Sequence, residues 1–435
     1  MDLSQADSSD VPEDPADIET FPDVWFYPEQ LRDGLEVPDL SEETIQEALA
    51  CAYEYARSVI PEWKDNAKYM AFTKTIVIAV VAEFRGDLVP QDGSSIVLGY
   101  DLEGLLDSLF GSDTELRAAM SREFRAFLLL SVEKSSKRLD SELFRRYLCA
   151  LTESPQTWFR LRDCDALVRY TIASALSCNE CVDVIFSEEQ WRLIGELCCT
   201  LYDAVAFHKH RAEGETNSTF GYFDAHTRVK SFQLYRMVLW AIDVPWATNP
   251  AKRCVVNFLR FFGGPLHMMT RRYRFVEDGL RIGKPETEQV VELTRANFKL
   301  WNRVEETAAQ LKYDGRYADF VAQSDKLMFD GFCDLLQRSG SRECVNCTFI
   351  VTGTTKDIRQ FGGIQLCRPC KEKWGLSMAE FPERFKTAFP ETQNEITKLI
   401  KGLWQIQGGI ALNFAATRAI RIGKGLDMSL NISSH

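Results

Sequence analysis

The stretch EEQWRLIGELCCTLYDAVAFHKH (Glu188–His210) places apolar residues three or four positions apart along its length. This spacing puts them on one side of an α-helix. The same pattern recurs before residue 340, where turn signals separate the segments and no series of alternating strands is visible. We therefore predict an all-α body. Further examples are SEETIQEALACAYEYARSVI (Ser41–Ile60), ELRAAMSREFRAFLLLSVEKSS (Glu115–Ser136) and EQVVELTRANFKLWNRVEETAAQL (Glu288–Leu311).

One apolar run could form either a strand or a helix. TIVIAVVA (Thr75–Ala82) is rich in β-branched residues, which favour strands. Its flanks continue an apolar helical face, so we predict a buried helix. The run is also much shorter than the roughly 20 residues that cross a bilayer. No membrane span is expected.

Charge and composition exclude several classes of protein. The 435 residues are 45% hydrophobic and 26% charged, with a formal charge of -12. Nucleic acid or anionic lipid would require a basic surface, so neither is expected as a partner. Residues 1–20 form an acidic segment without an apolar targeting core, and we predict a disordered tail and a cytoplasmic protein. The predicted order is this tail, a helical catalytic domain (21–340), a zinc ribbon (341–375), and C-terminal helices with a tail (376–435).

Two cysteine pairs form the most specific motif. CVNC (Cys344–Cys347) is followed after nineteen residues by CRPC (Cys367–Cys370). Four thiolates at this spacing can bind a tetrahedral zinc, and the intervening segment is typical of a short β-hairpin. A site with four sulfurs has no open coordination position, which favours a structural Zn²⁺ over a redox pair or chance spacing. The other pair, CNEC (Cys178–Cys181), lacks a partner pair and is interpreted as small buried residues.

A pair of carboxylates follows the apolar run. On a continuous helix Glu83 and Asp87 would lie on one face, because they are four residues apart. Burial of two carboxylates is costly unless a cation compensates for it, and Mg²⁺ accepts such ligands together with diphosphate oxygens. The alternative is that Glu83 caps the helix or pairs with Arg85 or another arginine.

A second polar group follows the opening stretch. If that helix continues, Asp203, His210, Glu213 and Asn217 fall within roughly 80° of one another. The carboxylates and the amide are candidate ligands for metal or water, and His210 is a candidate acid or base. Gly214 could end the helix first, and the alternative is a solvated helix end.

Arginine side chains are the third group of candidates. Planar guanidinium groups bind phosphate through two hydrogen bonds, and a diphosphate needs several such donors. Asp163 and Asp165 are reserve metal ligands or residues in salt bridges. The candidate diphosphate contacts are Arg85, Arg211, Arg271, Arg272 and Tyr273, with Asn217.

Several segments of residues 22–375 closely resemble the fungal abscisic-acid-pathway sesquiterpene cyclases, the α-ionylideneethane synthase family. Among them are AEFRGD, FRLRDCDALVRYTIASALSCN, LYDAVAFHKHRAEGETNSTF and NFLRFFGGPLHMMTRRYRFVEDGLRIGK. Arg272 followed by Tyr273 is also similar to the pair that contacts diphosphate in class I terpene synthases. The resemblance implies a terpene-synthase-like helical bundle. The chain has His208 where the family is expected to have tyrosine.

The resemblance also implies an activity. Members convert farnesyl diphosphate to α-ionylideneethane and lack the aspartate-rich DDxxD motif, which is absent here too. Unusual ligands for Mg²⁺ are therefore implied, and the matching positions are Glu83, His210 and Glu213. The implied path deprotonates and reprotonates neutral polyenes, so it requires an acid and a base. Two alternatives stay open: a different terpene product, and a non-catalytic protein whose zinc ribbon binds a partner.

Overall fold

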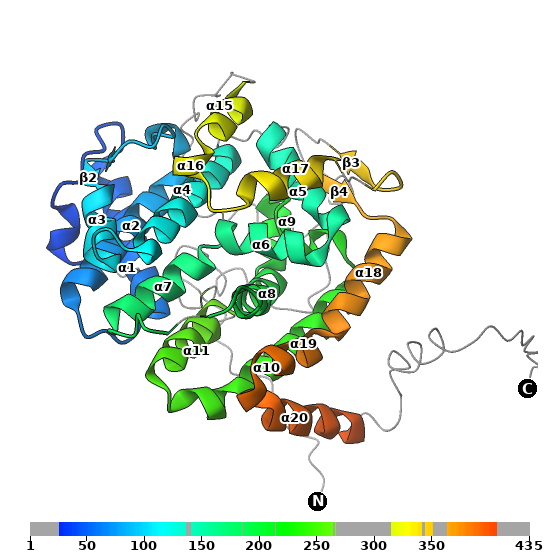
Figure 1. Cartoon of the computed structure of the whole chain (residues 1–435). Helices are drawn as coiled ribbons and strands as arrows, with labels where there is room; N and C mark the ends of the chain where they lie inside the picture. The colour runs from blue at the N-terminus through cyan, green and yellow to red at the C-terminus, as the bar shows by residue number, and fades with distance from the viewer. Residues whose placement is uncertain are drawn as a thin grey trace, which may run out of the picture.

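The computed structural model describes residues 26–135, 141–184, 186–213, 215–263, 266, 315–341, 344–350 and 363–406, and of residues 212, 213, 341, 350 and 402–406 the backbone alone. Helices dominate the described chain, which confirms the all-α prediction (Figure 1). The helices are α1 (Glu42–Val59), α2 (Asn66–Phe84), α3 (Leu102–Phe110), α4 (Glu115–Ser135), α5 (Glu142–Glu153), α6 (Pro155–Asp165), α7 (Val168–Cys178), α8 (Glu188–Val205), α9 (Phe207–Glu213), α10 (Ala225–Ala247), α11 (Pro250–Phe262), α15 (Arg316–Ala322), α16 (Ser324–Leu327), α17 (Phe332–Ser341), α18 (Arg368–Ala379), α19 (Phe381–Ala388) and α20 (Gln393–Ile406). The 3₁₀ turns are η1 (Glu29–Arg32), η2 (Gly86–Leu88), η3 (Thr219–Tyr222) and η6 (Pro390–Thr392).

Local capping residues begin many of the helices. The Ser41 hydroxyl accepts a hydrogen bond from the Thr44 amide at the start of α1. At the start of α8, Ser187 and Gln190 form a reciprocal capping box. Such side chains satisfy the amide groups that a first helical turn leaves unpaired. The same role falls to Asp65, Asp101, Ser141, Ser154, Asp224 and Asn249.

The core is built around helices that are buried on nearly every side. Thr75–Ala82 lies inside α2 and is buried throughout, so the prediction of a buried helix is confirmed. Helix α8, seen almost end-on near the centre of Figure 1, packs against α6, α7, α10 and α11. Among the described residues, no helix combines the length and the apolar character needed to cross a membrane.

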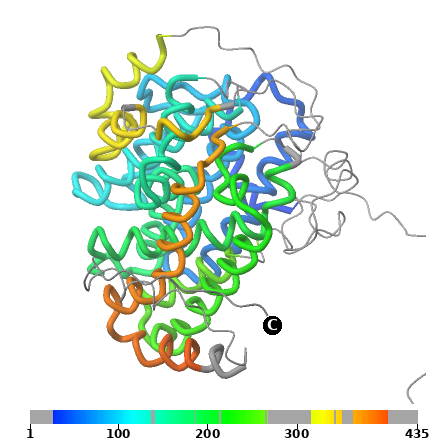
Figure 2. Tube along the Cα trace, turned by 90° about the vertical axis from the view of Figure 1, so that its right-hand side faces the viewer, coloured from blue at the N-terminus to red at the C-terminus, as the bar shows by residue number. Residues whose placement is uncertain are grey.

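The few strands form two small antiparallel pairs. One pairs β1 (Ile96–Val97) with β2 (Tyr100–Asp101). The other pairs β3 (Thr348–Ile350) with β4 (Gly363–Gln365), with Phe349 opposite Ile364. This second pair confirms the antiparallel strands predicted between the cysteine pairs, while residues 351–362 lie outside the described residues. Helices α18 to α20 then run from β4 down one flank of the molecule (Figure 2).

Candidate active site

The C-terminal end of α6 carries a buried carboxylate that binds several side chains. Asp165 accepts hydrogen bonds from Arg162 Nη1 at 2.6 Å and from the Tyr147 hydroxyl at 3.0 Å. It also accepts one from Asn217 Nδ2 at 2.7 Å and pairs with the ammonium group of Lys134. Asp165 therefore links α4, α5 and α6 to the loop that follows α9.

A second buried carboxylate, Asp203 on α8, shares the same arginine. Arg162 donates from Nη2 to Asp203 Oδ1 at 2.7 Å and from Nε to Oδ2 at 3.2 Å. The amide and hydroxyl of Thr219 donate to Oδ2 at 2.8 and 2.6 Å, and the Trp158 indole in turn donates to that hydroxyl. These contacts tie η3 back onto α6 and α8.

His210 on α9 lies at the edge of this network between two carboxylates. Its Nδ1 lies 3.9 Å from Asp203 Oδ1, and its Nε2 lies 3.6 Å from Glu215 Oε2. Only 1% of His210 is exposed, and its ring lies 5.4 Å from the ring of Tyr202. A buried imidazole flanked by carboxylates has the arrangement of a general acid or base whose protonated form is stabilised by nearby negative charge. We call Lys134, Tyr147, Trp158, Arg162, Asp165, Asp203, His210, Glu215, Asn217 and Thr219 the central polar network.

Opposite charges within this network keep one another ionised despite their burial. Burial alone would raise the pKa of Asp165, but the charges of Lys134 and Arg162 outweigh it and hold that pKa below its usual value. Burial likewise opposes the charge of Arg162, yet Asp203 and Asp165 raise its pKa well above the usual value. Burial and the charge of Asp165 raise the pKa of Tyr147, so this hydroxyl stays a donor.

The stability of the folded chain is expected to fall in acid through Asp165. Folding lowers the pKa of Asp165. The ionised carboxylate therefore adds to the free energy of unfolding in full above about pH 4, and this stabilisation is lost as pH falls through the pKa of the folded state. Below about pH 4 we expect the free energy of unfolding of Asp165→Asn to fall less steeply with falling pH than that of the wild type. The two slopes should differ by up to about 1.4 kcal/mol per pH unit. Urea unfolding of both proteins over this range measures the two slopes. Parallel slopes would contradict the prediction.

The polar stripe required one continuous helix from Asp203 to Asn217, and the chain does not form one; the expected alternative of a helix that ends near Gly214 agrees with the end of α9 at Glu213. Helix α8 ends before His210, and α9 ends at Glu213, so Asn217 lies in the loop before η3. The hydrogen bonds of Thr219 to Asp203 turn the chain back onto α8, which a continuous helix would prevent. The alternative of a solvated helix end is also wrong, because His208, Lys209 and His210 are at most 3% exposed.

The predicted pairing of Glu83 and Asp87 on one helix is wrong as well. Helix α2 ends at Phe84, and Asp87 lies in η2, where it binds Arg85 Nε and Nη2 at 2.9 Å each. The chain leaves the helix at Arg85, where φ is -129° and ψ is 56°, and Gly86 then packs so closely on α4 that an added Cβ would lie 2.9 Å from Val132 Cα. Glu83 occupies the last turn of α2 and is partly buried.

The remaining predicted residues are placed only in part. Arg211 lies on α9 and is partly buried, and the backbone of Glu213 ends that helix, while its side chain lies outside the described residues. Arg271, Arg272 and Tyr273 also lie outside the described residues. The diphosphate site therefore stays a prediction.

The donor set fits Mg²⁺ only in part. Both carboxylate oxygens of Asp203 already accept hydrogen bonds from Arg162 or Thr219. Both oxygens of Asp87 accept hydrogen bonds from Arg85. Among the described side chains, the cysteine cluster is the one group of three or more His, Cys, Asp or Glu residues whose ligand atoms lie close enough to share an ion. Glu83 and Glu213 thus remain as predicted magnesium ligands.

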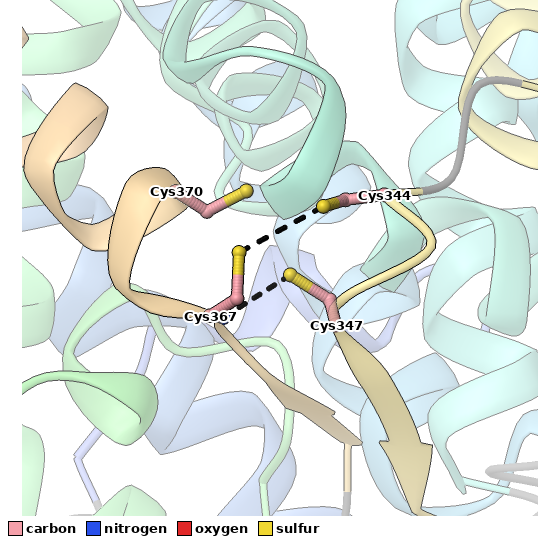
Figure 3. Close-up of side chains that lie close together, drawn as sticks. All are labelled: Cys344, Cys347, Cys367 and Cys370. Atoms are coloured by element: carbon pink, nitrogen blue, oxygen red, sulfur yellow. Dashed lines mark hydrogen bonds between the residues drawn. The ribbon is translucent and has the colours of Figure 1, made fainter.

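The four predicted zinc ligands do converge. The sulfurs of Cys344, Cys347, Cys367 and Cys370 lie within 4.8 Å of one another and face a common centre (Figure 3). A zinc–sulfur distance of about 2.3 Å implies tetrahedral sulfur–sulfur separations of about 3.8 Å. The observed Sγ–Sγ distance between Cys344 and Cys367 is 3.8 Å. The cluster is therefore consistent with a zinc site.

The surroundings of the cluster also suit a metal ion. The Cys367 amide lies 3.2 Å from the sulfur of Cys347, a contact that supports a negatively charged sulfur. The backbone at Asn346 lowers the pKa of the Cys344 thiol to about 7, whereas burial raises that of Cys347 to about 11. Zinc binds the thiolate form of cysteine, and of these two thiols Cys344 ionises at the lower pH.

We expect the purified chain to hold one zinc ion at this cluster. Cys367→Ser is expected to abolish stoichiometric zinc and to lower the melting temperature by about 5 °C or more. Cys181→Ser is the matched control, because Cys181 is a partly buried thiol outside the cluster. Elemental analysis measures the metal. Equal zinc in the two variants would exclude the cluster as the binding site.

Sequence reasoning missed several members of the central polar network. The network members that no sequence pattern indicated are Lys134, Tyr147, Trp158, Arg162, Glu215 and Thr219. The signal that could have indicated Arg162 is its position three residues before Asp165 in a helix that is buried along its length. Glu215 could not be found in this way, because its position depends on how the loop turns.

Comparison with known proteins identifies close relatives. Residues 23–391 match the family model described as alpha-ionylideneethane synthase aba3. Alpha-ionylideneethane synthase aba3 of Botryotinia fuckeliana is 47% identical over 369 residues, which cover 85% of this chain and 84% of the relative. Alpha-ionylideneethane synthase abl3 of Leptosphaeria maculans is 48% identical over 370 residues, or 85% of this chain and 86% of the relative. The abl3 synthase of Pyricularia oryzae is 43% identical over 433 residues, covering 85% and 83% of the two chains.

Proposed function

Because the chain belongs to the α-ionylideneethane synthase aba3 family, we propose that it is a sesquiterpene cyclase acting on farnesyl diphosphate. The product would be α-ionylideneethane or a related cyclic C15 hydrocarbon, formed with release of diphosphate. The matched segment supports this reading, because it contains the central polar network and all four clustered cysteines.

The observation that carries the proposal is the placement of His210. Its two ring nitrogens lie 3.9 and 3.6 Å from the carboxylates of Asp203 and Glu215, at the edge of the buried central polar network. A path through neutral polyenes requires removal and return of a proton, and a buried site keeps water from the cationic intermediates. A simple structural ion pair would not require an imidazole at this position.

We assign the proton transfers to His210 Nε2, which faces Glu215 at the more exposed side of the network. Asp203, held by Arg162 and Thr219, lies on the Nδ1 side of the ring, where its charge would stabilise the protonated imidazole. Glu213 remains a second candidate base. Arg85, Arg211, Arg271, Arg272 and Tyr273 are assigned to the diphosphate, with Asn217 kept in place by Asp165.

Dependence on Mg²⁺ is a further part of the proposal. Bound Mg²⁺ would supply charge neutralisation to the departing diphosphate. Glu83 and Glu213 are the ligands we assign to it, because Asp87 and Asp203 are engaged with arginines.

The direct test is turnover of farnesyl diphosphate. We expect the purified chain with Mg²⁺ to release diphosphate and a volatile C15 hydrocarbon, identified by gas chromatography. Addition of EDTA should stop both, and Glu83→Gln should lower turnover at least about 100-fold, whereas the exposed Glu115→Gln should not. No release from any C10 to C20 prenyl diphosphate would favour the non-catalytic alternative. A different hydrocarbon would keep the enzyme class and change the product.

A further inference from the structure

The cysteine cluster touches the last turn of α5. The Cys344 amide donates to Thr152 Oγ1 at 3.4 Å, and the Trp374 indole donates to the Leu151 carbonyl at 2.8 Å. Lys373 Nζ donates to the carbonyl of Glu153, the last residue of α5, at 2.5 Å. The final carbonyl groups of a helix lack partners within it, so the cluster and α18 act here as a cap supplied by a distant part of the chain.

The β-hairpin of the same cysteine cluster touches the loop that carries Glu215, the residue that faces His210. Gly363 of β4 has φ of +94° and packs on the ring of Tyr222, where an added Cβ would lie 2.8 Å from Cζ and 2.9 Å from Cε1. Only glycine permits both this backbone conformation and this approach. The Tyr222 hydroxyl then donates a hydrogen bond to the carbonyl of Thr216.

Thr216 lies between two residues of the central polar network. On one side, Glu215 faces His210 Nε2 and donates its amide to the His210 carbonyl at 2.8 Å. On the other side, Asn217 donates to Asp165. A chain of contacts therefore links the cysteine ribbon (Cys344–Cys370) to His210: Gly363 contacts Tyr222, Tyr222 bonds to Thr216, and the neighbouring Glu215 faces His210.

We propose that the zinc-bound cysteine ribbon is a positioning element for the candidate active site. It fixes residues 215–219 through Gly363 and Tyr222, and it fixes the α5–α6 corner through the cap on α5. Tyr222 is thus a positioning residue that acts on His210 through Glu215. The effect on turnover depends on the function proposed above, whereas the effect on the loop does not.

Hydrogen exchange tests, independently of activity, whether the cysteine ribbon fixes residues 215–219. The reporter amides are Glu215, bonded to the His210 carbonyl, and Thr219, bonded to Asp203. Removal of zinc with a chelator is expected to accelerate exchange at both at least about tenfold, while α2 and α7 remain protected. Unchanged exchange at Glu215 and Thr219 in the zinc-free chain would overturn the proposal.

A variant that leaves the cysteines intact separates positioning from loss of folding. Tyr222→Phe removes the hydroxyl, which contacts the Thr216 carbonyl and the Ile364 backbone, and leaves the four cysteines intact, so zinc content should stay at the wild-type level. Exchange at Glu215 should rise about five- to tenfold. Tyr100→Phe is the matched control, because the hydroxyl of Tyr100 likewise donates to a backbone carbonyl, that of Leu31, in a different part of the fold.

Steady-state kinetics test whether this positioning by Tyr222 affects turnover. With farnesyl diphosphate, Tyr222→Phe is expected to lower kcat about tenfold and to leave KM within about twofold, since Asn217, the loop residue assigned to the diphosphate, stays bonded to Asp165. Gly363→Ala should act in the same direction with zinc retained. Equal kcat values in Tyr222→Phe, Tyr100→Phe and wild type would overturn the role in catalysis. If the wild type shows no turnover, the proposed function fails and the exchange experiment still decides the role of the ribbon.

Discussion

Replacement of His210 by asparagine is expected to lower kcat by about 10²- to 10⁴-fold while the chain stays folded. The substitution keeps a polar side chain beside Asp203 but removes the ring nitrogen that faces Glu215. An amide cannot accept and return a proton under these conditions, so deprotonation and reprotonation of a polyene would stall. The measurements are hydrocarbon formation and diphosphate release from farnesyl diphosphate.

The same experiment also distinguishes ionisation from proton transfer. If His210 acts only after the diphosphate has left, the variant should accumulate uncyclised or partly cyclised C15 hydrocarbons. His226→Asn is the matched control, because His226 is exposed near the start of α10. Wild-type turnover in the His210 variant would remove this histidine from the site.

Replacement of Arg162 by methionine is expected to cost about 3–5 kcal/mol in the free energy of unfolding. Arg162 is 3% exposed and pairs with both Asp165 and Asp203. Its loss would leave two carboxylates buried, with Lys134 as the remaining cation paired with Asp165. Arg162→Lys should cost less, because it keeps the charge but cannot donate to both carboxylates in the same planar geometry.

Urea unfolding at neutral pH measures this loss. Arg260→Met is the control, because Arg260 pairs with Asp243 at the surface with half of its side chain exposed, and such pairs contribute at most about 1 kcal/mol. Equal stability of the two variants would show that the network does not depend on Arg162. Any Arg162→Met protein that remains folded is also expected to lose turnover, since Asp203 would no longer be held beside His210.

Features that depend on nearby residues could be predicted from the sequence. The apolar spacing around Thr75–Ala82 predicted a buried helix against its β-branched composition, and α2 confirms it. The capping residues and the two cysteine pairs are signals of the same kind. A helix turn, a helix cap and a CxxC knuckle each form within a few residues, so the chain specifies them before any distant contact is made.

Roles of the charged residues depended on the distant contacts. Asp165 was a reserve metal ligand by sequence, and it became the centre of the central polar network because Asn217, 52 residues away, turns back toward it. Arg162 reaches Asp203 across 41 residues. Glu215 faces His210 only because the chain leaves the helix after α9.

The sequence by itself therefore determined the helical character of the described chain, the burial of the apolar run in α2, and where four sulfurs can meet. The helix expected at Glu288–Leu311 lies outside the described residues. Only the tertiary structure decided which carboxylate pairs with which cation, and it removed Asp87 from the predicted ligand helix by bringing Gly86 against α4. The physical reason is the cost of burying charge. A buried ion must find its partner wherever packing brings one, and sequence spacing does not encode that position.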